Sequence, residues 1–147
     1  MKHVSPDLDL GSDCFAAVGL DFKIFVGLEE LSFPMMAVGA CGLMNAVGNL
    51  RPRVLSDMCE AVWRGDLNGA QALHHRLHEI NKAVFFDPNP IPMKYMAKKL
   101  GLIASNQPRL PIRPANPQLR QRLNTVPTTP HLSWAIQARR HSLRVHD

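Results

Sequence analysis

Cysteine is scarce in this sequence, with three residues among 147 and no pair at C-x-x-C spacing. An odd number without that spacing excludes a disulfide framework and a cysteine-based zinc site, so we expect no bound metal. Cys14 and Cys59 fall in helical patterns and are expected to be small core residues. Cys41 lies just before a predicted strand, and we expect it to be buried as well.

Long apolar runs are also missing. A membrane helix needs about 20 consecutive apolar residues, and no stretch of the chain approaches that length. The first three residues are soon followed by Asp7, Asp9 and Asp13, whereas a signal peptide would show an apolar segment there. The sequence therefore predicts a cytoplasmic protein with no membrane partner.

Acidic residues become rare toward the C-terminus. Residues 1–108 carry 10 Lys/Arg and 11 Asp/Glu, whereas residues 109–147 carry seven Arg and a single acid, Asp147. The net charge of +5 therefore reflects the tail and says little about the folded part. No aromatic platform accompanies these arginines, so we expect no nucleic-acid partner.

Helical patterns and short apolar runs alternate over residues 1–64. The expected elements are a helix at Pro6–Val18 with Ser5 as its N-cap, a strand at Lys23–Val26, a helix at Glu29–Val38, a strand at Gly42–Val47 and a helix at Arg53–Arg64. Pro34 should shorten or kink the second helix. Glu29 and Glu30 lie in its first turn, where acids complement the helix dipole. This alternation is typical of βαβ units and a parallel sheet.

The remainder of the chain is helical and poor in strands. Ala70, Leu73, Leu77, Ile80 and Val84 are spaced by three or four residues and predict the longest helix. A further helix is expected at Pro92–Leu100, before Gly101. We expect residues 1–64 to form one unit, residues 65–123 a helical region, and residues 124–147 a basic, disordered tail. A frayed surface helix at Trp134–Arg144 is the alternative for the tail.

Several motifs occur in a fixed order along residues 1–123. They are K-H-V-S-P-D-L at residues 2–8, F-V-G at 25–27, G-A-C-G-L-M-N-A-V-G-N at 39–49, R-G-D at 64–66, N-P-I-P-M-K at 89–94, G-L at 101–102 and R-L-P at 109–111. In this order and spacing they resemble the dihydrodipicolinate synthase / N-acetylneuraminate lyase family. The combination of N-P-I-P-x-K with R-L-P is the most specific part of the resemblance.

The resemblance implies an α/β fold: the C-terminal portion of a (β/α)8 TIM barrel, strands six to eight, followed by a C-terminal helical appendage. A lysine at position 2 alone would indicate only a solvated side chain. By resemblance, Lys2 is the nucleophile that forms a Schiff base with a 2-oxo acid such as pyruvate, and Gly27 and Met44 line the substrate pocket. No cofactor is expected. Asn45 and Met44 depart from the family pattern, where serine and isoleucine are common, and these changes bear on the identity of the substrate rather than on the class. Leu28 replaces a residue that is often polar in the synthases.

The family's barrel needs roughly 250 residues, and parts of its pattern are missing here. The sequence contains neither G-T-T-G-E, which holds the 2-oxo carboxylate in the family, nor Y-N-x-P, which carries its proton-relay tyrosine. We therefore expect a truncated Schiff-base lyase with little activity alone. The alternative is a non-catalytic half-barrel that self-associates or pairs with a full-length paralogue.

A histidine cluster offers a weaker candidate site. His74 and His78 are spaced i, i+4 and could face one metal ion. No H-E-x-x-H pattern accompanies them, and the pair flanks the apolar stripe of its helix. A structural role is the favoured interpretation. Lys98 and Lys99, near the end of a predicted helix, match the helix dipole and require no partner.

Overall fold

Three short strands form a parallel sheet at the N-terminal end of the protein. The computed structural model describes residues 1–127. Its strands are β1 (Lys2–His3), β2 (Phe25–Val26) and β3 (Gly42–Leu43), in the order β1-β2-β3. Lys2 pairs with Phe25, and Phe25 with Gly42. The predicted parallel arrangement of the second and third strands is confirmed, although each strand has only two residues.

Helices connect the strands as the alternation predicted. The connecting elements are α1 (Leu8–Val18), the 3-10 helix η1 (Glu29–Leu31) and α2 (Ser32–Ala37). The N-cap of α1 is Asp7, whose Oδ1 accepts the N–H of Asp9 at 3.0 Å, so the assignment of Ser5 was wrong. The helix expected at Glu29–Val38 is divided into η1 and α2. Pro34 falls in the first turn of α2, where its missing N–H interrupts no helical hydrogen bond.

The sheet is covered on one face only within residues 1–127. Ile24 and Val26 are fully buried and pack with Phe15 of α1 and with Met35 and Met36 of α2. Val4, Phe25 and Met44 are exposed by 57%, 37% and 54%. We call the surface that these three residues share with Lys2 the open face. Parallel sheets usually carry cover on both faces.

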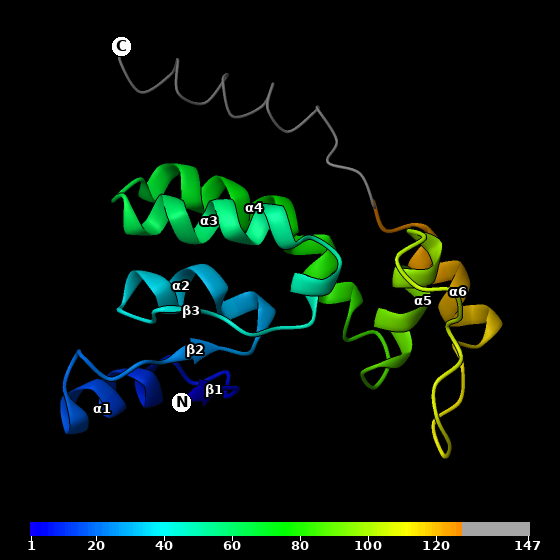
Figure 1. Ribbon diagram of the computed structural model, residues 1–147, viewed down its shortest axis with the longest axis horizontal. Helices are drawn as coiled ribbons and strands as arrows, with labels where there is room; N and C mark the ends of the chain where they lie inside the picture. Colours follow the sequence, from blue (N-terminus) through cyan, green and yellow to red (C-terminus); the bar gives the residue numbers. More distant parts are fainter. Residues whose placement is uncertain (128–147) are drawn as a thin grey trace, which may run out of the picture.

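A helical hairpin forms the centre of the larger hydrophobic core. α3 (Pro52–Trp63) and α4 (Leu67–Ala83) lie side by side (Figure 1). Gly65, with φ +76°, makes the turn between them. Asp66 then caps α4 by accepting the N–H of Gly69 at 2.8 Å. The predicted stripe of α4 is its buried face: Ala70, Leu77 and Ile80 are each less than 5% exposed.

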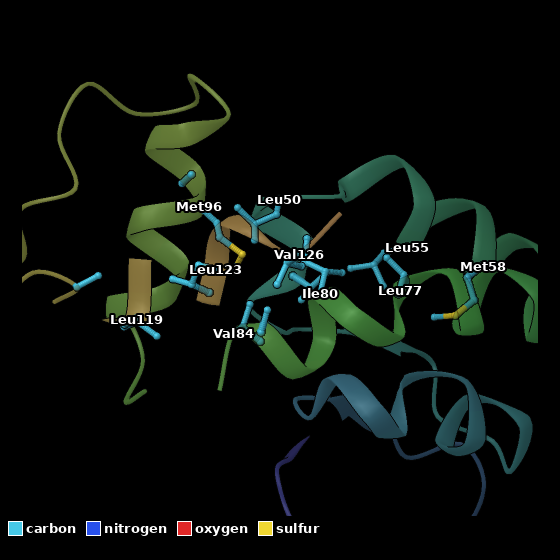
Figure 2. Packing of buried hydrophobic residues seen from close by; sticks show 14 of the residues in the cluster. Leu50, Leu55, Met58, Leu77, Ile80, Val84, Met96, Leu119, Leu123 and Val126 are labelled. Carbon is cyan, nitrogen blue, oxygen red and sulfur yellow. The ribbon is translucent and has the colours of Figure 1, made fainter. Parts of the chain in front are cut away.

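Two shorter helices, α5 (Ile91–Lys99) and α6 (Pro117–Asn124), extend this core (Figure 1). Figure 2 shows buried side chains of this core, from α4, α5, α6 and the residues that flank these helices and α3: Leu50, Ile80, Val84, Met96, Leu119, Leu123 and Val126. Val126 is 6% exposed, so packing continues past Leu123, where the basic tail was expected to begin. Residues 128–147, with the alternative helix at Trp134–Arg144, lie outside the described residues. Among residues 1–127, no helix combines the length and the apolar character needed to cross a membrane.

Candidate active site around Lys2

Lys2 is held in place by main-chain hydrogen bonds on both sides. The N–H of Phe25 donates to the carbonyl of Met1 at 2.8 Å, and the N–H of Gly27 donates to the carbonyl of His3 at 2.7 Å. The side chain of His3 is buried beneath the sheet, whereas that of Lys2 is exposed on the open face. The strand therefore fixes the position of the lysine backbone but leaves its side chain in contact with water.

Gly27 lies directly under the Lys2 side chain. A Cβ atom at residue 27 would stand 2.6 Å from Lys2 Cε and 3.0 Å from the carbonyl oxygen of His3, and it would also overlap Val4. A side chain at residue 27 would displace Lys2 Cε and Val4, because another segment of the chain approaches closely here. Lys2 pairs with Phe25, two residues before Gly27, so its side chain leans toward the carboxyl ends of the strands. Active sites of parallel α/β barrels lie at that end.

Lys2 opens onto a groove of about 880 Å³. Met44 lines the same groove, with Phe25 and Gly42 between them. The structure therefore brings Lys2 and Met44 together, and it places Gly27 beneath Lys2. Lys94 of α5 also lines the groove, whereas no aspartate or glutamate of residues 1–127 does. A cleft lined by charges of one sign attracts ligands of the opposite sign, so the groove favours a negatively charged ligand.

The turn that follows Met44 is stabilised by hydrogen bonds to the side chain of Glu29. Glu29 Oε1 accepts the backbone N–H of Ala46 at 2.7 Å and that of Val47 at 3.2 Å. The residue is 1% exposed, and burial raises the pKa of its carboxyl above the ordinary value. Beside it, Asn45 Nδ2 donates to Ser32 Oγ at 3.1 Å. This role of Glu29 is not visible in the sequence, because an acid in the first turn of a helix is equally typical of a solvated surface charge.

The histidine cluster lies on α4, next to η1 and α2. The His74 ring stands 5.9 Å from that of Phe33, and burial lowers the pKa of His74. His75 and His78 line a cavity with His74. Within residues 1–127, no three histidine, cysteine, aspartate or glutamate side chains are arranged to hold a metal ion.

Comparison with known proteins identifies the family. The family model described as "Dihydrodipicolinate synthetase family" matches residues 1–128. The chain belongs to the dihydrodipicolinate synthetase family. A relative named 4-hydroxy-tetrahydrodipicolinate synthase, from Thermus thermophilus, is 42% identical over 126 residues. Another of that name, from Aquifex aeolicus, is 32% identical over 125 residues.

Solved structures of this family share the fold. The dihydrodipicolinate synthase of Aquifex aeolicus superimposes with a TM-score of 0.80 at 32% identity, covering 85% of this chain and 42% of that one. The 4-hydroxy-tetrahydrodipicolinate synthase of Methylacidiphilum fumariolicum SolV also gives 0.80, at 29% identity, with 92% and 43% covered. The match to the Thermus relative covers 86% of this chain and 42% of that protein. The chain thus spans about 42% of the length of this relative.

Proposed function

We propose that β1, β2 and β3 are strands six to eight of a (β/α)8 barrel, and that Lys2 forms a Schiff base with a 2-oxo acid such as pyruvate. The observation that carries this proposal is the passage of the Lys2 side chain over Gly27 toward the carboxyl ends of the strands. The sheet order and the coverage of the relatives agree with the barrel assignment.

The chemistry begins with attack of the Lys2 nitrogen on the ketone carbon of the 2-oxo acid. The carbonyl π electrons move to oxygen, and a proton passes from the nitrogen to that oxygen to give a carbinolamine. The hydroxyl then leaves as water with the second proton of the nitrogen, which forms the imine. The two lysines of the groove attract the substrate carboxylate. Met44 lines the groove beside Lys2, and the missing side chain at Gly27 leaves room for the Lys2 side chain itself.

Loss of water from the carbinolamine requires a proton donor, and later steps require a base. Within residues 1–127, those that line the groove include no tyrosine and no carboxylate. The open face also leaves Lys2 exposed, whereas catalytic lysines gain reactivity when they are shielded from water. We therefore infer that the chain alone forms the imine slowly and turns over poorly.

Borohydride trapping tests the role of Lys2. The protein is incubated with pyruvate and sodium borohydride, and the modified residue is located by peptide mass mapping. We expect one reduced adduct on Lys2 in the parent chain and in Lys23→Ala, a matched change of a nearby exposed lysine, and none in Lys2→Ala. Adducts spread evenly over exposed lysines would refute the assignment.

Turnover is a separate measurement. With pyruvate and an aldehyde, we expect a rate far below that of a full-length relative assayed in parallel, because the part of the groove that residues 1–127 form offers no proton donor of its own. A comparable rate that Lys2→Ala abolishes would show that the rest of the barrel is dispensable.

A second candidate function is a non-catalytic half-barrel that pairs with itself or with a full-length paralogue. The observation in its favour is the exposure of Val4, Phe25 and Met44 on the open face, since unpaired strand edges and apolar patches recruit partners. In sedimentation at low micromolar concentration, we expect self-association that Met44→Gln weakens. Leu20→Gln, which changes an apolar side chain 76% exposed, is the control. A monodisperse monomer that unfolds cooperatively would contradict this alternative.

A further inference from the structure

The part of the chain that forms α5 and α6 contains no acidic residue. Between Asp87 and Asp147 the sequence has no aspartate or glutamate. Residues 88–127 nevertheless carry seven cations: Lys94, Lys98, Lys99, Arg109, Arg113, Arg120 and Arg122. Positive charges in this region therefore have no carboxylate close in sequence to neutralise them.

Three of these cations converge on one cleft. A cavity of about 430 Å³ is lined by Lys98 and Lys99 of α5, Arg120 of α6, Asn106 of the connecting segment, and Tyr95. We call it the cationic cleft. The two helices that frame it lie together at one end of the molecule (Figure 1). A cleft lined by one sign of charge concentrates the electrostatic potential and raises the local concentration of counter-ions.

The geometry of the cationic cleft is fixed by hydrogen bonds. Arg120 Nε donates to the carbonyl of Ala115 at 2.7 Å, which anchors the guanidinium and leaves its two terminal nitrogens free of that bond. The hydroxyl of Tyr95 donates to Asn124 Oδ1 at 3.1 Å and ties α5 to α6 beside the cavity. An anchored guanidinium is suited to paired hydrogen bonds with the oxygens of an anion.

The helix dipole does not account for this arrangement. Lys98 and Lys99 occupy the last turn of α5, where cations are favoured. Arg120, in contrast, is the fourth residue of α6, whose N-terminal end disfavours positive charge. Its presence beside two lysines adds repulsion that a bound anion would relieve.

We propose that the cationic cleft is a binding site for a small anion of the phosphate class, such as pyrophosphate or the phosphate group of a metabolite. Tetrahedral phosphate oxygens accept hydrogen bonds from several directions, which matches one guanidinium, two ammonium groups and the Asn106 amide. The volume of the cleft suits a small molecule. This site is independent of the Schiff-base chemistry at Lys2.

Calorimetry with sodium pyrophosphate at constant ionic strength tests the proposal on the full chain. We expect saturable binding that Lys98→Gln and Arg120→Gln each weaken about tenfold or more, and that Lys98→Arg largely retains. Lys82→Gln, in the last turn of α4, and Arg76→Gln on the same helix are the matched controls. They should leave the affinity unchanged.

Three outcomes would overturn the site. One is the absence of saturable binding, and another is binding that survives both Lys98→Gln and Arg120→Gln, which would place the anion elsewhere on the chain. The third is tighter binding of a single-stranded oligonucleotide than of pyrophosphate, with the same dependence on Lys98 and Arg120. The cleft would then bind a nucleic-acid backbone instead of a small anion. Equal unfolding midpoints of variants and parent ensure that a loss of binding is not a loss of fold.

Discussion

Replacement of Glu29 by alanine should destabilise the protein far more than an ordinary loss of surface charge. The change removes the acceptor of two hydrogen bonds, at 2.7 Å from Ala46 N and 3.2 Å from Val47 N. A hydrogen bond to a charged group contributes about 1.5–3 kcal/mol, and a buried donor left without a partner costs about 1–3 kcal/mol. Relief of the buried carboxylate offsets part of this loss. We expect a net decrease of about 2–4 kcal/mol in the free energy of unfolding.

Glu30→Ala is the matched control, because Glu30 is the exposed neighbour in the same turn of η1. Exposed substitutions of this kind usually change stability by less than about 0.5 kcal/mol. Urea unfolding followed by circular dichroism, with the midpoint and slope fitted separately, measures both variants. If Glu29→Ala were no more destabilising than Glu30→Ala, the hydrogen bonds to the turn after β3 would not stabilise it.

The pH dependence gives an independent check through Glu29→Gln, which keeps an acceptor oxygen. Burial raises the pKa of Glu29 above its ordinary value of 4.5. The native state therefore binds this proton more tightly than the unfolded state, so the contribution to stability is present below pH 4.5 and is lost as pH rises through the folded pKa. The stability of the parent relative to Glu29→Gln should fall as pH rises above 4.5. A difference that stays constant would contradict the raised pKa.

Two further predictions concern the glycine under Lys2 and the buried thiol. Gly27→Ala should lower the free energy of unfolding, measured in urea, by about 1–3 kcal/mol, as overpacking does, and should reduce borohydride trapping on Lys2. Gly48→Ala is the control, because its Cβ would meet its nearest neighbours at 3.7 Å. Equal effects of the two changes would contradict the close approach of Lys2 and Val4 to Gly27. Cys59 is 8% exposed, and burial raises the pKa of its thiol. It should therefore react with iodoacetamide more slowly than the half-buried Cys14, which mass mapping can measure. Faster reaction of Cys59 in the folded protein would show that α3 opens.

Local patterns predicted the helices of this protein well. The helix expected from Ala70 to Val84 is α4, and those expected at Arg53–Arg64 and Pro92–Leu100 are α3 and α5, each within a few residues. Hydrophobic spacing, capping residues and glycine stops act over one or two turns, so they are visible in the sequence. α6 was not predicted separately, although Asn116 followed by Pro117 is a typical helix start.

Helix starts that depend on competing local residues were harder to predict. Ser5 and Asp7 can both cap α1, and Ser5 Oγ in fact accepts the N–H of Asp7, which leaves Asp7 to cap the helix. The helix expected to begin at Glu29 begins as the 3-10 helix η1, in which Glu29 is buried. The helical pattern of the sequence does not reveal this burial. The N-cap is the residue whose side chain reaches the free N–H groups of the first helical turn, and only the three-dimensional structure shows which of the two suitable side chains does so.

Residue order was sufficient to recognise the family and to predict the parallel strands, because motif spacing and hydrophobic periodicity are properties of neighbouring residues. The roles of Lys2, Gly27 and Met44 follow from the resemblance alone and stay predictions. Residue order did not reveal that Glu29 would support the turn after β3, 17 residues away, or that Lys98 and Arg120 would share a cleft. These contacts join segments distant along the chain. Their formation depends on how the helices pack, and burial then determines whether a charged side chain is solvated or bound.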